Sequence, residues 1–125
     1  MNEELFSVKE LNHTRTEVTS TLIINPHCII LNGHFPGQPV VPGACMLQIT
    51  KEVLETALNY PVKLRKADHL KFTGMIDPQK TTMLQLAIRY QINDETISVT
   101  AKLTDEDRIC FKLQGIFLKH TENIK

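Results

Sequence analysis

Residues 33–58 read GHFPGQPVVPGACMLQITKEVLETAL and join a stiff loop to a long amphipathic segment. The first eleven residues, 33–43, hold three prolines and three glycines, which predicts an irregular loop. Pro42 suits a first helical position, and apolar residues recur at helical spacing from Gly43 to Leu58. We therefore expect one helix over 43–58, ended by Asn59-Tyr60-Pro61.

The apolar arc of this predicted helix is wide. At about 100° per residue its apolar members cover well over half of the circumference. They are Met46, Leu47, Ile49, Val53, Leu54, Ala57 and Leu58. Such an arc indicates a helix wrapped by other elements, and the remaining polar wedge holds Gln48, Lys51, Glu52 and Glu55.

Strand-like patterns occupy most of the remaining chain, with β-branched residues and a period of two. The expected strands cover Thr14–Ile24, Val62–Phe72, Thr82–Ile92, Thr96–Leu103 and Ile109–Leu118. Leu5–Val8 is too short to assign. Short polar turns at 93–95 and 105–107 predict that the last three strands form an antiparallel meander.

These elements predict the α+β class. We expect a single domain over 1–125, with a highly curved antiparallel sheet of five or six strands around one long central helix.

Composition excludes several classes of protein. A length of 125 residues fits one domain, and 42% apolar with 22% charged residues is ordinary for a globular chain. Lys+Arg and Asp+Glu number 14 each, so bulk positive charge cannot hold nucleic acid, and we expect no nucleic-acid partner. No run approaches 18 apolar residues, and Met1–Glu4 is polar with no signal-peptide core after it. We therefore expect a cytoplasmic protein without a membrane partner.

The sequence shows no metal-ligand spacing. Cys28, Cys45 and Cys110 are widely separated and form no CxxC pair, which favours buried reduced thiols. The five histidines show no HxxxH or HExxH spacing, so we expect no metal site; they are His13, His27, His34, His69 and His120.

The loop at 33–43 resembles the HFPGxPxxPG signature of the bacterial 3-hydroxyacyl-[acyl-carrier-protein] dehydratases. Lys71–Pro78 resembles the basic-aromatic strand and proline-containing turn of that family, and the similarity in pattern covers nearly the whole chain. The resemblance implies the hotdog fold, in which a sheet wraps a central helix. It also implies a homodimer or higher oligomer in which each active site is built from two subunits.

The same resemblance implies an activity. The family dehydrates 3-hydroxyacyl thioesters to trans-2-enoyl thioesters, and fatty-acid or related polyene and polyketide synthesis supplies these substrates. The substrate carries phosphopantetheine on acyl carrier protein, so no cofactor of the protein's own is expected.

The resemblance also assigns residues. It implies that His34 is the catalytic histidine and that the backbone N–H of Gly43 polarises the thioester carbonyl. We expect Phe35, Val41 and Pro42 to bind substrate. Core packing for Phe35 and loop stiffening for Pro42 are the alternatives.

One catalytic position departs from the family. Fourteen residues after the histidine the family has Glu or Asp, and this chain has Gln48. A carboxamide cannot protonate the leaving hydroxyl and can only orient it, or a water, by hydrogen bonds. Either His34 shuttles the proton alone, Gln48 holds a water that does so, another carboxylate substitutes, or the homodimer is not a competent dehydratase. Glu52 is the nearest substitute, about 40° around the helix and about 6 Å along it.

The segment 63–71 holds four of the basic residues of an otherwise neutral chain. They are Lys63, Arg65, Lys66 and Lys71. A basic rim near the active site would attract an acidic acyl carrier protein, and an ordinary solvated strand face is the alternative.

Three functions therefore compete. The first is dehydration of 3-hydroxyacyl thioesters. The second is a non-catalytic partner subunit in a heterodimer with a homologous dehydratase that supplies the missing carboxylate. The third is an acyl-thioesterase, which usually needs a carboxylate on the same helix and lacks the HFPG loop.

Overall fold

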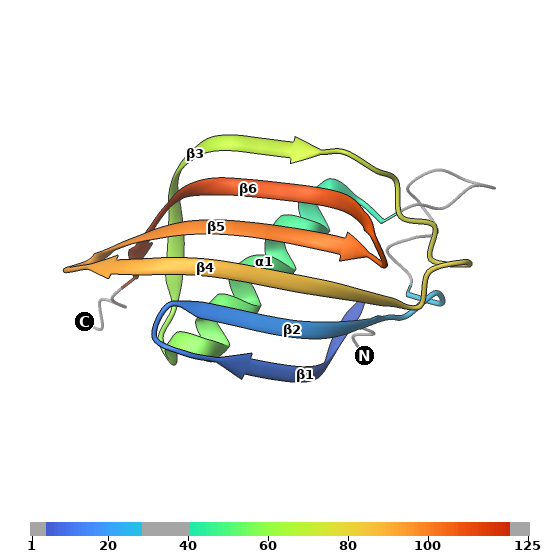
Figure 1. Ribbon diagram of the computed structural model, residues 1–125, viewed down its shortest axis with the longest axis horizontal. Coiled ribbons are helices and arrows are strands. Elements are labelled where there is room, and N and C mark those ends of the chain that lie inside the picture. Colours follow the sequence, from blue (N-terminus) through green and yellow to red (C-terminus); the bar gives the residue numbers. More distant parts are fainter. Residues whose placement is uncertain (1–4, 29–40, 121–125) are drawn as a thin grey trace.

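The computed structural model describes residues 5–28 and 41–120. In this part of the chain one helix lies against one face of a six-stranded antiparallel sheet (Figure 1). The elements are β1 (Phe6–His13), β2 (Glu17–Ile24), α1 (Gly43–Leu58), β3 (Val62–Phe72), β4 (Met83–Asn93), β5 (Thr96–Asp105) and β6 (Arg108–Lys119). The strand order is β1-β2-β4-β5-β6-β3, which confirms the predicted α+β class and the predicted meander of the last three strands.

The predicted start of the second strand was wrong by three residues. The prediction began at Thr14, but β2 begins at Glu17. The hydroxyl of Thr14 accepts hydrogen bonds from the amides of Thr16 and Glu17, at 3.2 and 3.1 Å. A threonine that bonds to its own following backbone favours a turn over a strand, so these residues connect β1 to β2.

Strand β1 lies in a segment for which the sequence pattern predicted no helix or strand. Only Phe6 of its eight residues is buried, so it lacks the alternation of a half-buried strand. A bulge between Val8 and Glu10 shifts its register against β2 and breaks the period further. Pairing with β2 stabilises β1.

The core lies between α1 and the inner face of the sheet. Five helix residues are buried: Met46, Ile49, Thr50, Val53 and Leu54. The buried hydroxyl of Thr50 donates to the carbonyl of Met46 at 2.9 Å, so it satisfies its hydrogen bond within the helix.

The sheet wraps one side of the helix only. The buried helix face confirms part of the wide apolar arc, but Leu47, Ala57 and Leu58 are only half-buried. Gln48 and Glu52, in the predicted polar wedge, are exposed in this single chain.

The end of the helix is tied to the start of β3. Asn59 adopts a left-handed conformation with φ of 67°, and its amide donates to the carbonyl of Glu55 at 2.7 Å. The carboxylate of Glu55 then accepts the Val62 amide at 2.8 Å. Two bulges in β3, between Leu64 and Lys66 and between Ala67 and His69, let this edge strand bend around the sheet (Figure 1).

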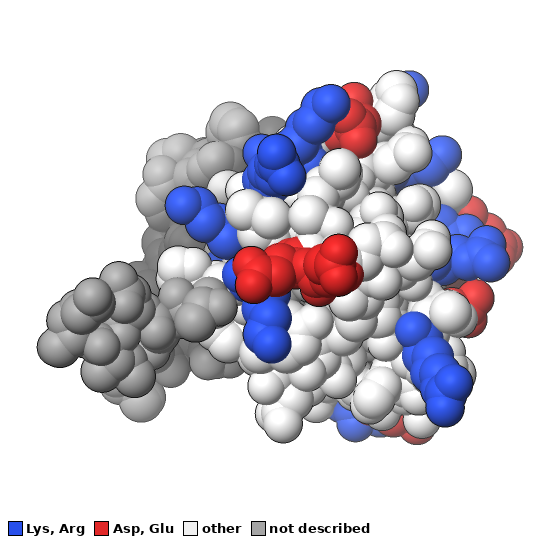
Figure 2. Space-filling view, turned by 90° about the vertical axis from the view of Figure 1, so that its left-hand side faces the viewer, with Lys and Arg blue, Asp and Glu red and all other residues white. Residues whose placement is uncertain are grey.

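Charges of both signs mix at one end of the molecule. Figure 2 shows this end, the left-hand side of Figure 1, with acidic side chains at the centre and basic side chains around them. Within residues 5–28 and 41–120, no helix is long and apolar enough to cross a membrane.

Candidate active site at the helix start

The predicted site begins just outside the described residues. His34 and Phe35 lie in the range 29–40, which the structure does not describe, so their predicted roles stay predictions. The described chain resumes at Val41, which is buried and donates its amide to the carbonyl of Ile76 at 3.0 Å. This bond fixes the entry to the helix against the loop between β3 and β4.

At the start of α1 two backbone amides have no hydrogen-bond partner within residues 5–28 and 41–120. The amides of Cys45 and Met46 donate to the carbonyl of Pro42, at 3.0 and 3.3 Å. No described side chain caps the helix, so the amides of Gly43 and Ala44 have no partner among the described residues. Uncapped amides at a helix start carry partial positive charge and stabilise negative charge placed near them.

An apolar pocket of about 540 Å³ opens beside this helix start. Its lining residues are Val41, Gly43, Met46, Phe72, Thr73, Gly74 and Met75. Phe72 is 50% exposed and Met75 is 65% exposed, which is unusual for side chains of this size. The pocket therefore offers apolar contact surface next to positively polarised amides.

Glycine at position 43 allows the wall of this pocket to approach the helix. A Cβ atom there would lie 2.8 Å from a ring carbon of Phe72, far inside normal contact distance. The Phe72 ring also packs against Phe111, with ring centroids 5.4 Å apart. Any larger side chain at position 43 would therefore displace Phe72 and reshape the pocket.

Gln48 lies on a different side of the helix and is paired with Glu52. Its side-chain amide donates to a carboxylate oxygen of Glu52 at 2.9 Å. Both residues line a smaller pocket of about 190 Å³, together with Leu5, Phe6, Cys45 and Ile49. The predicted substitute acid is therefore a hydrogen-bond partner of Gln48 in this structure.

Gly43 and Gln48, the two predicted catalytic positions within the described residues, lie on different sides of α1. Gln48 lies five positions after Gly43, which turns the two about 140° apart around the helix axis. The pockets that they line share no residue. The two positions therefore line separate pockets in this single chain.

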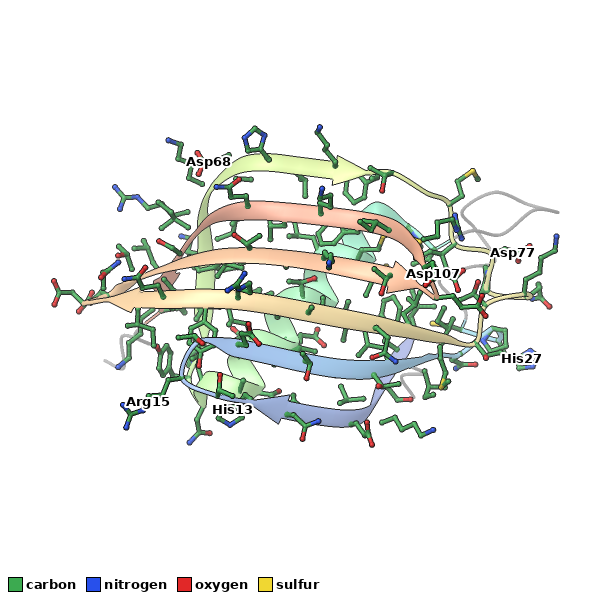
Figure 3. The ribbon with its side chains drawn as sticks, viewed as in Figure 1. His13, Arg15, His27, Asp68, Asp77 and Asp107 are labelled. Carbon is green, nitrogen blue, oxygen red and sulfur yellow. The ribbon has the colours of Figure 1, made fainter. Side chains whose placement is uncertain are left out.

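The predicted docking residues do not form one patch. Lys63, Arg65, Lys66 and Lys71 are all exposed on β3, but its bend separates the first three from Lys71. Lys66 forms an ion pair with Asp68 at 3.3 Å, and Figure 3 shows Asp68 at the β3 edge of the molecule. Lys71 precedes Phe72 in β3, but it lines a groove on the outer face of the sheet and not the pocket at the helix start.

The described cysteines form no disulfide, and two of the three have the predicted burial. Cys28 and Cys110 are buried and Cys45 is half-buried. Burial raises the pKa of the Cys45 thiol, and the neighbouring Cys28 adds to this rise. In the ranges 5–28 and 41–120, no group of three or more His, Cys, Asp or Glu side chains is placed to hold a metal ion.

Sequence reasoning did not select Phe72 and Met75 as site residues. Phe72 continues an apolar strand pattern, and Met75 stands in a turn. From sequence alone, large apolar side chains at a strand end would be assigned to the core. Only the fold shows that these two are exposed.

Several solved structures share this fold. One is the dehydratase heterocomplex ApeI:P from Xenorhabdus doucetiae, with a TM-score of 0.73 and 18% identity over 90% of this chain and 97% of that chain. Cj0977, a sigma28-regulated virulence protein of Campylobacter jejuni, has a TM-score of 0.71 and 12% identity over 97% and 88%. The putative thioesterase yhdA from Lactococcus lactis has a TM-score of 0.68 and 10% identity over 92% and 94%. These likenesses confirm the predicted hotdog fold.

A search of curated proteins finds no match. A family model does match: the ApeI-like family, described as ApeI dehydratase, aligns with residues 10–114. This range holds the predicted loop, the helix and most of the sheet. The chain therefore belongs to the ApeI-like dehydratase family.

Proposed function

We propose that this protein dehydrates 3-hydroxyacyl thioesters on acyl carrier protein to trans-2-enoyl thioesters, in fatty-acid or related polyene or polyketide synthesis. Membership of a dehydratase family supports the reaction class. The uncapped helix start at Gly43, beside an apolar pocket, is the observation that supports a thioester with an acyl chain. The substrate brings its own phosphopantetheine arm, and the protein needs no cofactor.

The proposed reaction divides between charge stabilisation and proton transfer. Removal of a proton from C2 places negative charge on the thioester oxygen, which the Gly43 amide stabilises. His34 is the proposed base, because an imidazole titrates near neutral pH. The C3–O bond then breaks, and the proton held by His34 returns to the leaving hydroxyl, so the products are the enoyl thioester and water.

Gln48 is proposed to orient the leaving hydroxyl. One N–H of its amide is used by Glu52. The amide oxygen and the second N–H have no partner among the described residues, so they can bind the hydroxyl or a water. Glu52 holds the amide in place, and it is also the alternative acid within reach of the same pocket.

The proposed site is shared between two chains. The separation of Gly43 from Gln48 around the helix supports a site in which one chain supplies His34 and Gly43 and a second supplies Gln48. A homodimer or higher oligomer meets this requirement.

A second candidate function is that of a partner subunit. A glutamine at the family's acid position favours it, since a homologous chain would then supply the carboxylate. The similarity to a chain of the ApeI:P dehydratase heterocomplex supports a heterodimer of this kind.

Acyl carrier protein is the proposed partner in solution. Lys71 is exposed near the end of β3 closest to the pocket at the helix start, and its charge would attract an acidic carrier from a distance, although it does not line that pocket. Lys63, Arg65 and Lys66 lie beyond the bend of β3, so we expect them to add less to docking.

Mass spectrometry of a 3-hydroxyacyl carrier protein mixed with purified protein tests the proposal. The expected product is lighter by one water and is absent with His34→Ala. Gln91→Glu is a matched control for Gln48→Glu, because Gln91 is an exposed β4 residue outside both helix pockets.

The outcomes separate the candidates. Product from wild type supports dehydration without the family's carboxylate. Product only after Gln48→Glu, and not after Gln91→Glu, supports the partner subunit. Release of free 3-hydroxy acid by wild type would contradict both and identify a thioesterase.

A further inference from the structure

Three lysines stand in one row on the outer face of the sheet, the face turned away from α1. Lys102 of β5 is directly opposite Lys112 of β6, and Lys112 is directly opposite Lys71 of β3. Neighbouring strands lie about 4.8 Å apart, so the three Cα atoms fall within about 10 Å. Like charges at directly opposed positions destabilise a sheet, so the lysine row does not serve the fold.

Nearby acids do not neutralise the lysine row. None of the ion pairs among residues 5–28 and 41–120 involves these three lysines. Glu17 is the one acid among the described residues that line the groove with them, and it contacts Arg89 at 3.5 Å. Figure 3 shows Asp77 and Asp107 at the end of the sheet, away from its centre.

The lysine row lines a groove of about 490 Å³, a volume typical of small-molecule sites. The groove adds two further basic side chains, Arg89 and His69, on the neighbouring row of the same face. Thr19, Thr100 and Gln114 contribute neutral hydrogen-bond donors, and Ala87 leaves room between them. The described lining contains no Phe, Tyr or Trp side chain, and the imidazole of His69 is its one ring on which a base could stack.

We propose that this groove binds a small ligand that carries two or more linked phosphate groups. Ammonium groups bind phosphate oxygens as point charges, and a row of three suits a chain of phosphates better than a single anion. The lining offers positive charges and hydroxyl groups, which bind phosphate oxygens. We therefore expect the groove to recognise the phosphate chain itself and not a group attached to it.

Charge and size argue against other occupants. A second copy of the same face would oppose the row with its own lysines. An acidic protein would need about 800 Å² of surface on each partner, whereas the cations gather in one hollow. The proposal does not depend on dehydratase activity, because the groove lies across the sheet from α1.

Isothermal titration calorimetry with tripolyphosphate at low salt tests the proposal, with sulfate as the single-anion control. We expect one site per chain that binds tripolyphosphate at least tenfold more tightly than sulfate. Lys112→Gln and Lys102→Gln should each weaken binding about tenfold, a loss of one charged contact. Lys9→Gln is the matched control, because Lys9 is an exposed strand lysine outside the groove.

Thermal unfolding of each variant establishes that it is folded. Equal affinity for tripolyphosphate and ATP would support recognition of the phosphate chain alone, and tighter binding of ATP would support a nucleotide ligand. The absence of one-site binding, an equal loss in Lys9→Gln, or variants that weaken only the binding of acyl carrier protein would each overturn the proposal.

Discussion

Replacing Gln48 by glutamate places two carboxylates where the structure has a hydrogen bond. The amide nitrogen of Gln48 and a carboxylate oxygen of Glu52 are 2.9 Å apart. Two unit charges at this distance repel by about 1.4 kcal/mol in a medium as polar as water. Both side chains are exposed, so water screens the repulsion and keeps it near this value. Rotamer changes that move the two carboxylates apart reduce it further.

The repulsion has a defined pH dependence. It raises the pKa of the carboxyl pair in the folded Gln48→Glu variant above that of the unfolded chain. A raised folded-state pKa contributes stability at low pH that is lost as the pH rises through it. At neutral pH we therefore expect the variant to be about 1 kcal/mol less stable than wild type, with Tm lower by roughly 3–5 °C. Near pH 4 the difference should vanish.

The same change should alter the activity. A carboxyl group whose pKa is raised keeps its proton at higher pH, which is what a general acid requires. If only the acid is missing, dehydration should rise by about 10²–10³. Calorimetric unfolding at several pH values and the rate of enoyl thioester formation measure the two effects.

The double variant Gln48→Glu with Glu52→Gln is the control. It restores a carboxamide–carboxylate pair with the positions exchanged, so stability at neutral pH should return. If the Tm of Gln48→Glu equals that of wild type at every pH, the contact between the side chains at positions 48 and 52 is refuted. A destabilised variant without any gain in rate would refute the role of position 48 as the missing acid.

Two further predictions concern packing and thiol chemistry. Gly115→Ala should cost about 3 kcal/mol, because the new Cβ would lie 2.3 Å from the backbone oxygen of Lys66 and would force β3 away from β6. In Gly74→Ala the new Cβ would clash with the end of the Arg108 side chain, 2.7 Å away, and not with backbone. Arg108 can move aside at the cost of its hydrogen bonds to Met75 and Asp105, so the loss should be smaller. Chemical denaturation of both variants compares them, and equal losses would contradict the reasoning. Because burial raises the pKa of the Cys45 thiol, its alkylation at pH 8 should be slower than that of a small free thiol and should accelerate as the pH rises. Mass spectrometry of the alkylated protein measures this, and faster labelling than the free thiol would contradict it.

Local pattern was sufficient for much of the fold. The helix over 43–58 and the strand over 62–72 have the predicted bounds. Helical periodicity, Pro42 and Asn59 mark the helix directly, and the end of the helix marks where the strand can begin. The meander of β4, β5 and β6 followed from alternation and short polar turns. By contrast, β1 had no readable signal, since its stability comes from pairing with β2 and not from its own pattern.

The predicted catalytic residues followed from a motif, but their arrangement did not. The sequence by itself identified the loop at 33–43, the glycine at the helix start and the glutamine at position 48. Only the tertiary structure showed that Gly43 and Gln48 face different pockets, that Phe72 and Met75 stand exposed beside the helix start, and that Gln48 pairs with Glu52.

The lysine row is the clearest case of a feature that only the tertiary structure decided. Lys71, Lys102 and Lys112 are dispersed along the sequence, and each reads as an ordinary exposed strand residue. Strand order and register place them side by side. Periodicity within a strand is local and therefore readable in sequence, whereas register between strands depends on bulges and long-range packing that only the folded chain determines.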